Sequence, residues 1–321
     1  METQSMSRPL VPGVYVPTTC FFTKDREDVD ISTIAKHAVR LARVGVTGVA
    51  TQGSNGEAVH LTRSERQLVT ATTRRALDNN GFGNMPIIVG CGAQSTHETI
   101  RHCRDAHEAG GDYALILPPS YYASLFAPAA ETLLDYFTVV ANRSPIPLIL
   151  HNFPLVASGL DLSSDVIIKI AQHPNILGVK LTCGNLGKLN RVVNGTRSLQ
   201  VGPHNRQFLV FSGSAESLLQ SLAGGGHGVI GGLANIAPKA CVKVMELYQQ
   251  GKISEAQEIQ AVVSNGDWAA IQGGIVGVKA GLQGWVGYGG YARSPLPKPT
   301  EDEAVRWTEA FRDLMILEVT M

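Results

Sequence analysis

Lys180 is the residue whose type and surroundings point most directly to chemistry. It lies near the end of the run Asn175–Leu181, where isoleucine, leucine, glycine and valine precede it. Burial among such neighbours disfavours an ammonium cation, so the pKa of this lysine is expected to fall and its neutral amine becomes available. A neutral amine beside a carbonyl compound forms an imine, which withdraws electrons from the adjacent bond once it is protonated. The alternative is a lysine whose stem packs while its ammonium group reaches solvent at the rim.

Two other segments carry groups that could assist such an amine. The turn Gly53–Glu57 combines small side chains with backbone N–H groups that could bind a carboxylate, although an ordinary strand-to-helix turn has the same composition. Tyr121 and Tyr122 could supply a phenol that carries a proton, or their rings could serve only in packing. The pattern alone leaves both alternatives open in each segment.

The elements that must position these residues alternate along the chain. Short runs that are apolar throughout indicate parallel strands buried on both faces, and stretches of helical periodicity separate them. The predicted strands are 13–18, 48–51, 86–90, 113–117, 147–151, 176–180, 208–212 and 228–231. The predicted helices are 30–44, 62–79, 95–109, 128–142, 163–172, 186–194, 214–224 and 237–250.

Eight strand–helix units in about 250 residues predict an α/β fold, a (β/α)8 TIM barrel. An open doubly wound sheet is the alternative, but it would carry a G-x-G-x-x-G turn where this chain has Thr18, Thr19 and Cys20. Beyond residue 252 the pattern is helical, near 253–283 and 301–317. We therefore expect an N-terminal extension (1–12), the barrel (13–252) and additional C-terminal helices packed on it (253–321).

Composition narrows the classes of partner and compartment. Lys+Arg and Asp+Glu are both 27, so the net charge is zero and the basic footprint of a nucleic-acid-binding protein is missing. No apolar run approaches the roughly 20 residues of a membrane helix. The 5 cysteines are scattered without a CxxC pair, and the first ten residues lack a secretory apolar stretch. These features predict a protein of a reducing compartment, placed in the cytoplasm, that binds neither nucleic acid nor membrane.

The sequence contains residues typical of two other kinds of site. His97, His102 and His107 are five residues apart, which spreads them around a helix, and Cys103 with His107 on one face are too few ligands for a metal. No metal site is therefore predicted. The glycines at 224–226 and 231–232 could bind phosphate near the last strands, or could only permit close packing.

Taken together, these segments resemble the class I aldolase superfamily of dihydrodipicolinate synthase and N-acetylneuraminate lyase. The resemblance runs from about Gly13 to Pro299, and within the superfamily it is closest to 4-hydroxy-2-oxoglutarate and fungal 2-keto-3-deoxy sugar acid aldolases. The matching segments are Gly53–Glu57 with Leu61, Ser64, Glu65 and Arg66; Tyr121 with Tyr122; Asn152 with Pro154; Gly178–Lys180; and Gly225–Ile230 with Asn235.

The resemblance implies roles for particular residues. Lys180 would form the imine with a 2-oxo acid such as pyruvate, so no separate cofactor is expected. Ser54 and Asn55 would bind the substrate carboxylate, and Tyr122 would complete a proton relay across a subunit boundary of a homodimer or homotetramer. The remaining residues of the expected substrate-binding set are Gly53, Gly213 and Ile230.

This chain departs from the family pattern at two places. His151 stands where the family has its catalytic tyrosine, and an imidazole with an ordinary pKa near 6.5 is a better base at neutral pH than a phenol near 10. The segment Leu155–Gly159 lacks the arginine with which dihydrodipicolinate synthases bind their second substrate. The second departure argues against lysine biosynthesis.

We therefore expect a lyase that cleaves or forms a carbon–carbon bond next to a 2-oxo acid, with pyruvate and an aldehyde as its small-molecule partners. The substrate would be a 2-keto-3-deoxy sugar acid or 4-hydroxy-2-oxoglutarate. Two alternatives stay open. One is a specialised synthase or hydratase-aldolase adapted through His151, and the other is a non-catalytic barrel that only binds 2-oxo acids.

Overall fold

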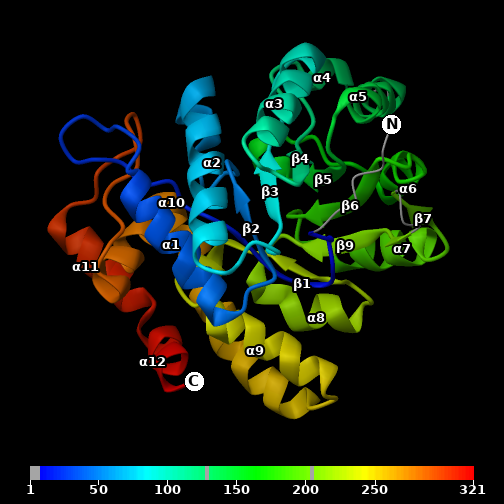
Figure 1. Cartoon of the computed structure of the whole chain (residues 1–321). Helices are drawn as coiled ribbons and strands as arrows, with labels where there is room; N and C mark the ends of the chain where they lie inside the picture. The colour runs from blue at the N-terminus through cyan, green and yellow to red at the C-terminus, as the bar shows by residue number, and fades with distance from the viewer. Residues whose placement is uncertain (1–7, 127–129, 203–205) are drawn as a thin grey trace.

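A closed barrel of parallel strands forms the centre of the molecule (Figure 1). The computed structural model describes residues 8–126, 130–202 and 206–321. Around the barrel the strand order is β1-β10-β9-β6-β5-β4-β3-β2, and β1 pairs with β10 to close it. The strands are β1 (Gly13–Pro17), β2 (Gly48–Thr51), β3 (Ile87–Gly90), β4 (Tyr113–Ile116), β5 (Leu148–Asn152), β6 (Ile176–Leu181), β9 (Leu209–Ser212) and β10 (Gly228–Ile230). The predicted (β/α)8 barrel is confirmed.

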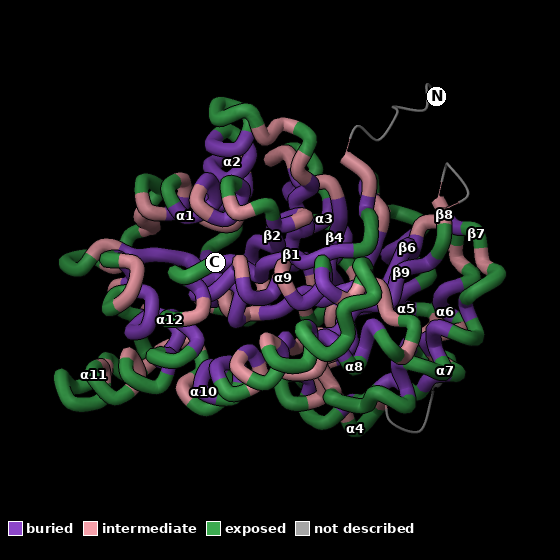
Figure 2. Tube along the Cα trace, turned by 90° about the horizontal axis from the view of Figure 1, so that it is seen from below, coloured by how far each residue is buried: buried purple, intermediate pink, exposed green. Residues whose placement is uncertain are grey.

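Burial explains why these strands are apolar at successive positions. Every residue of the barrel strands is buried, because one face fills the barrel interior and the other lies under the helices. Figure 2 shows this buried layer at the centre, with the exposed turns of the helices around it. Burying a polar side chain on such a strand therefore costs free energy unless the side chain finds a partner. Lys180 is one of the polar residues buried on these strands.

The barrel helices follow the predicted positions closely. They are α1 (Ile31–Val44), α2 (Arg63–Asn79), α3 (Thr96–Glu108), α5 (Ala130–Arg143), α6 (Ser164–Ile170), α7 (Leu186–Thr196), α8 (Leu218–Ala223) and α9 (Pro238–Gln249). Local sequence sets several of their starts. Thr62 and Glu65 form a reciprocal capping box at α2, and the Ser163 side chain caps α6. The predicted start of the helix near 128 lies outside the described residues.

Several short elements were not predicted. The helix expected at 214–224 is a 3-10 turn (Ala215–Ser217) followed by the short α8. A two-stranded hairpin, β7 (Gln200–Val201) with β8 (Arg206–Gln207), lies outside the barrel, and α4 (Ala123–Phe126) follows the tyrosine pair. These pieces are only two to six residues long, which is too short for a period to emerge from sequence.

The C-terminal segment forms helices that contact the helical layer of the barrel. They are α10 (Ile253–Val286), α11 (Glu301–Ala310) and α12 (Arg312–Thr320), and α10 contacts α9 and α11. The long helix is interrupted at Gly274, whose φ of 52° lies in the left-handed region that glycine tolerates. Gly273 and Gly277 lie against the Trp307 ring, where a larger side chain would crowd it. Within the described residues, no helix is long and apolar enough to cross a membrane.

Candidate active site

The parallel pairing of β5 and β6 brings two of the predicted site residues together. His151 lies directly opposite Lys180 in the register of this pair, near the C-terminal end of both strands. Residues opposite each other on neighbouring strands point to the same face of a sheet. The imidazole and the amine therefore share one site at the end of the barrel where barrel enzymes carry their chemistry.

Lys180 is buried, with 7% of its surface exposed. Burial lowers its pKa from the usual 10.5 to about 8, and the negative charge of Asp267 opposes part of this fall. At pH 7 about one molecule in ten then carries a neutral amine there, compared with fewer than about one in a thousand for an ordinary lysine. The site therefore supplies the nucleophile that imine formation requires.

His151 is held as a neutral imidazole. Its burial, and secondly the positive charge of Lys180, keep the pKa of His151 well below the usual 6.5. Its Nε2 atom lies 3.0 Å from the Oγ1 atom of Thr182, so this hydroxyl orients the ring. A neutral, oriented imidazole has a lone pair that can accept a proton, but its lowered pKa makes it a weaker base than an ordinary histidine.

Thr182 reaches this position because a glycine, Gly213, directly follows the neighbouring strand β9. Thr182 follows β6 directly, and the backbone N–H of Gly213 donates to the carbonyl of Leu181 over 2.7 Å. A Cβ atom at position 213 would collide with the Thr182 hydroxyl. Gly213, predicted as a substrate-binding residue, therefore admits the side chain that orients His151.

Asp267 is a site residue that sequence reasoning missed. It lies on α10, it is buried, and its carboxylate accepts hydrogen bonds from the Ser214 hydroxyl (2.6 Å) and the Glu216 N–H (2.8 Å). Burial raises the pKa of Asp267, and the hydrogen bonds from Ser214, Glu216 and Ala215 together with the charge of Lys180 offset only part of this rise. An acidic residue within an apolar helical stretch was the available signal, but its distance from Lys180 in sequence gave no reason to connect them.

The turn after β2 offers backbone donors at the same end of the barrel. The N–H groups of Gly56 and Glu57 close the turn by donating to Gly53 and Ser54, each over 3.1 Å. In the described part of the chain, the N–H groups of Ser54 and Asn55 have no hydrogen-bond partner. Two free, neighbouring N–H groups suit a carboxylate, and carboxylate binding by this turn stays a prediction.

The turn is held in a strained conformation by a buried charge cluster. Glu57 has a left-handed φ of 50° and is buried. Its carboxylate accepts from the Lys279 Nζ atom (2.6 Å) and the Arg293 N–H (2.9 Å), and it lies 3.1 Å from the His60 Nδ1 atom. The C-terminal segment therefore fixes the turn that carries Ser54 and Asn55.

Asn55 extends from this turn across to the end of β10. A Cβ atom at Gly232 would collide with the Asn55 amide, so the glycine leaves room for this side chain. Ile230, the last residue of β10, lies two residues before Gly232 and is fully buried. The glycine at 232 thus serves close packing of Asn55, which is one of the two alternatives weighed for the glycines there.

The tyrosine pair does not join the buried site within one chain. The Tyr121 and Tyr122 rings are 79% and 63% exposed, and they meet edge to face with centroids 5.0 Å apart. Tyr122 therefore lies outside the site formed by Lys180 and His151. Across the described residues, no group of three or more His, Cys, Asp or Glu side chains could hold a metal ion.

The fold and the site together define a (β/α)8-barrel protein with a buried, partly neutral lysine at its active end. The sequence profile of the dihydrodipicolinate synthetase family matches residues 13–312 of the chain. The chain therefore belongs to the dihydrodipicolinate synthetase family.

Relatives and solved structures agree with this assignment. The chain is 56% identical to "Probable 4-hydroxy-2-oxoglutarate aldolase, mitochondrial" of Emericella nidulans, over 97% of each chain. It is 45% identical to the L-threo-3-deoxy-hexylosonate aldolase of Aspergillus niger, over 98% of each chain. A dihydrodipicolinate synthase family protein from Coccidioides immitis has a similar crystal structure, with a TM-score of 0.82, 32% identity, and 96% and 97% of the two chains covered.

Proposed function

We propose that this protein is a class I aldolase that cleaves a 4-hydroxy-2-oxo acid into pyruvate and an aldehyde, or joins them in reverse. The substrate is a 2-keto-3-deoxy sugar acid or 4-hydroxy-2-oxoglutarate, the classes to which the names of the two relatives refer. The observation that carries the proposal is the buried Lys180 amine opposite His151 on neighbouring strands.

Imine formation is the first step. The neutral Lys180 nitrogen adds to the C2 carbonyl carbon of the 2-oxo acid, and the carbinolamine loses water to leave a protonated imine. The substrate carboxylate accepts hydrogen bonds from the free N–H groups of Ser54 and Asn55, which fixes C2 relative to the amine. The proposed reaction uses no cofactor, so turnover is expected to survive dialysis against EDTA.

Cleavage follows from the electron demand of the imine. Neutral His151 accepts the proton of the C4 hydroxyl, and the electron pair of the C3–C4 bond moves towards C2 and the imine nitrogen. The aldehyde leaves, which is glyoxylate when the substrate is 4-hydroxy-2-oxoglutarate. The resulting enamine is protonated at C3, and water then hydrolyses the imine to release pyruvate and restore the Lys180 amine.

Dihydrodipicolinate synthesis is a weaker proposal for this chain. The segment Leu155–Gly159 has no arginine to bind a second carboxylate, and the Leu155 side chain there is exposed. A specialised synthase or hydratase-aldolase would keep the same imine and use His151 on another carbonyl partner. A non-catalytic barrel would bind pyruvate without turning over any aldol donor.

Trapping the imine tests the proposal. Borohydride reduction of the folded protein with pyruvate should add a stable mass to the peptide that contains Lys180, and the Lys180→Ala variant should show no such adduct. The same enzyme should release pyruvate from a panel of 2-keto-3-deoxy acids and 4-hydroxy-2-oxoglutarate. An adduct without pyruvate release from any donor would leave only the binding function, and no adduct at Lys180 would refute the aldolase.

The protein is proposed to act as a homodimer or homotetramer in the cytoplasm. Exposed apolar side chains at the active end of the barrel, including Tyr121, Tyr122 and Leu125, support a subunit contact there. The Emericella relative is named as a mitochondrial protein. Imaging the full chain with a C-terminal fluorescent tag would show whether the protein lies in the cytoplasm or in mitochondria.

A further inference from the structure

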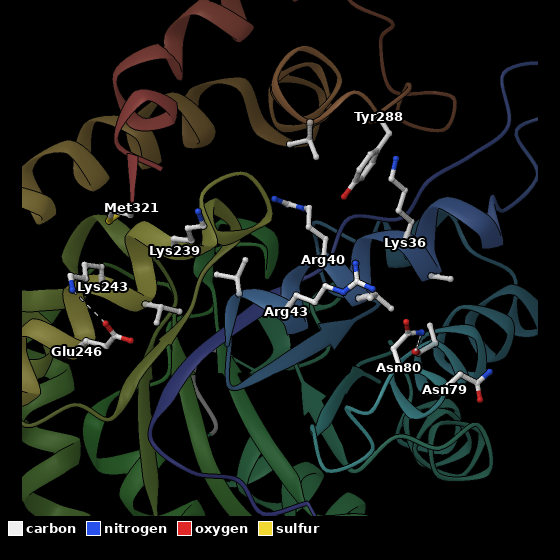
Figure 3. Close-up of a pocket in the computed structure, with 16 residues that line it drawn as sticks. Lys36, Arg40, Arg43, Asn79, Asn80, Lys239, Lys243, Glu246, Tyr288 and Met321 are labelled. Carbon is white, nitrogen blue, oxygen red and sulfur yellow. Dashed lines mark hydrogen bonds and ion pairs between the residues drawn. The ribbon is translucent and has the colours of Figure 1, made fainter. Parts of the chain in front are cut away.

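A cavity lies in the helical layer, and none of the residues of the lysine site lines it. Its volume is about 1210 Å³, and it runs between α1 and α9 (Figure 3). The C-terminal end of α2 and Tyr288, which follows α10, close its two sides. Small-molecule sites commonly measure about 300–1,000 Å³, so this groove has room for an extended ligand.

Helical spacing concentrates positive charge in the groove. Lys36, Arg40 and Arg43 are four and three residues apart on α1, so they share one helix face. Lys239 and Lys243 are four apart on α9 and also line the groove. Like charges at these spacings repel one another, and the chain as a whole has a net charge of zero. This concentration of cations is therefore local and costly without a counter-charge.

The nearby carboxylates offset only part of this charge. Glu246 lies 3.8 Å from Lys243 in an ion pair. Buried Glu318 interacts electrostatically with Arg40 and Lys239, but its two oxygens accept the backbone N–H groups of Lys239 (3.0 Å) and Ala240 (2.8 Å). Across the described residues, the other four cations of the groove form no ion pair; they are Lys36, Arg40, Arg43 and Lys239.

Arg40 supplies an independent sign of a missing partner. Its guanidinium donates to the carbonyl of Asn235, whereas its Nε atom is buried and has no hydrogen-bond partner. A buried donor without an acceptor is unfavourable, and an anionic oxygen would satisfy it. Lys36 lies 4.6 Å above the Tyr288 ring at the same side of the groove (Figure 3).

We propose that this groove binds a small molecule that carries two or more linked phosphate groups. The cation rows of α1 and α9 line the groove from two sides, which suits an extended chain of negative charges better than a single ion. Val39, Val242, Val286 and the Tyr288 ring provide apolar walls for a less polar part, such as a nucleoside. The site is separate from the aldolase reaction and does not depend on it.

Calorimetric titration of the full chain tests this site. ATP and inorganic tripolyphosphate are the probes, each in 25 mM salt and again in 500 mM salt with saturating pyruvate present throughout. Both probes are expected to bind in the presence of pyruvate. The high salt should lower their affinity because it screens exposed charges. Tighter binding of ATP would show that the nucleoside contributes, while equal affinities would assign binding to the phosphate chain alone.

Matched variants locate the binding. Arg43→Gln with Lys239→Gln should lower the affinity for both probes at least about tenfold, because neither side chain has an ion pair to lose. Lys169→Gln with Arg197→Gln removes two exposed cations elsewhere and should leave the affinity unchanged. Circular dichroism melting checks that both variants fold. No binding by the unmodified protein, or equal losses in the two variants, would overturn the proposal.

Discussion

At the scale of single residues, the reactivity of Lys180 depends on two opposing influences. Burial among the barrel strands lowers its pKa to about 8, and Asp267 limits the fall through its charge. A lower pKa of Lys180 provides more neutral amine for attack on the keto group. The imine, however, draws electrons from the C3–C4 bond only when it is protonated, and a nearby negative charge stabilises that protonated form. In the proposed reaction, Asp267 would therefore set a balance between capture of the keto group and cleavage.

Replacing Asp267 should move the pH dependence of the enzyme. In the unmodified protein, kcat/KM is expected to rise with pH through about 8, as Lys180 loses its proton. Asp267→Asn removes the charge that raises the pKa of Lys180, so the rise should shift to lower pH by roughly one unit. Ser214→Ala is the matched control, because it removes a hydrogen bond to Asp267 and keeps the charge. An unmoved profile in Asp267→Asn would contradict this role.

His151 can be tested separately from imine formation. His151→Phe should lower kcat for aldol cleavage by about 10²–10⁴-fold, because the C4 hydroxyl then has no proton acceptor. The same variant should still give the borohydride adduct with pyruvate, since Lys180 is retained. His151→Tyr restores a proton carrier and should recover part of the activity. Turnover at the original rate in His151→Phe would show that another group accepts the proton.

At the scale of elements, the C-terminal helix α10 supports the substrate-binding end of the barrel. It supplies Asp267 near Lys180, and its Lys279 pairs with Glu57 beneath the turn after β2. Both charges of the second pair are buried, and Lys279 also donates to the carbonyl of Tyr291 over 2.9 Å. Removing one partner of such a pair leaves the other charge uncompensated.

Lys279→Met should therefore destabilise the protein and weaken substrate binding. The expected loss in the free energy of unfolding is about 3–5 kcal/mol, measured by urea denaturation. The KM for the 2-oxo acid should rise more than kcat falls, because the turn that carries Ser54 and Asn55 loses its support. Lys252→Met, at an exposed ion pair with Glu255, is the matched control and should cost less than about 1 kcal/mol. Combining Lys279→Met with Glu57→Gln should recover part of the stability. Equal losses of stability in Lys279→Met and Lys252→Met would exclude a supporting role for the Lys279–Glu57 pair.

At the scale of the whole molecule, some of the exposed apolar residues lie on the segments that follow the strands. Val59, Tyr121, Tyr122, Leu125 and Leu155 are exposed on segments after β2, β4 and β5. Large exposed apolar side chains on neighbouring loops commonly mark a protein contact. A second copy of the chain would cover them and could bring Tyr122 to the site of its partner.

Light scattering coupled to gel filtration checks this expectation. The full chain should elute as a dimer or tetramer, and Tyr121→Ser with Leu125→Ser should shift it towards the monomer. If Tyr122 completes a proton relay across the contact, this double variant should also lose kcat while the borohydride adduct at Lys180 persists. Val305→Ser, at an exposed position of α11, is the matched control. A monomeric unmodified protein with full activity would contradict the proposed relay.

Much of this molecule was predictable because its information is local in sequence. A parallel strand buried on both faces must be apolar at successive positions, so eight such runs between helical stretches indicate the barrel. The same argument marks Lys180 as an exception within a buried strand. Helix starts at Thr62 and Ser163 follow from side-chain capping by neighbouring residues.

Only the tertiary structure decided which distant residues meet. The packing of α10 on the barrel brings Asp267 close enough to influence Lys180 and brings Lys279 to Glu57. The residues in each pair are more than 80 positions apart in sequence, and no periodic pattern predicts such a contact. The groove between α1 and α9 arises in the same way, because each helix shows an ordinary polar face until the two are placed side by side. Local pattern determines which residues are buried, whereas long-range packing determines the charges and cavities that surround them.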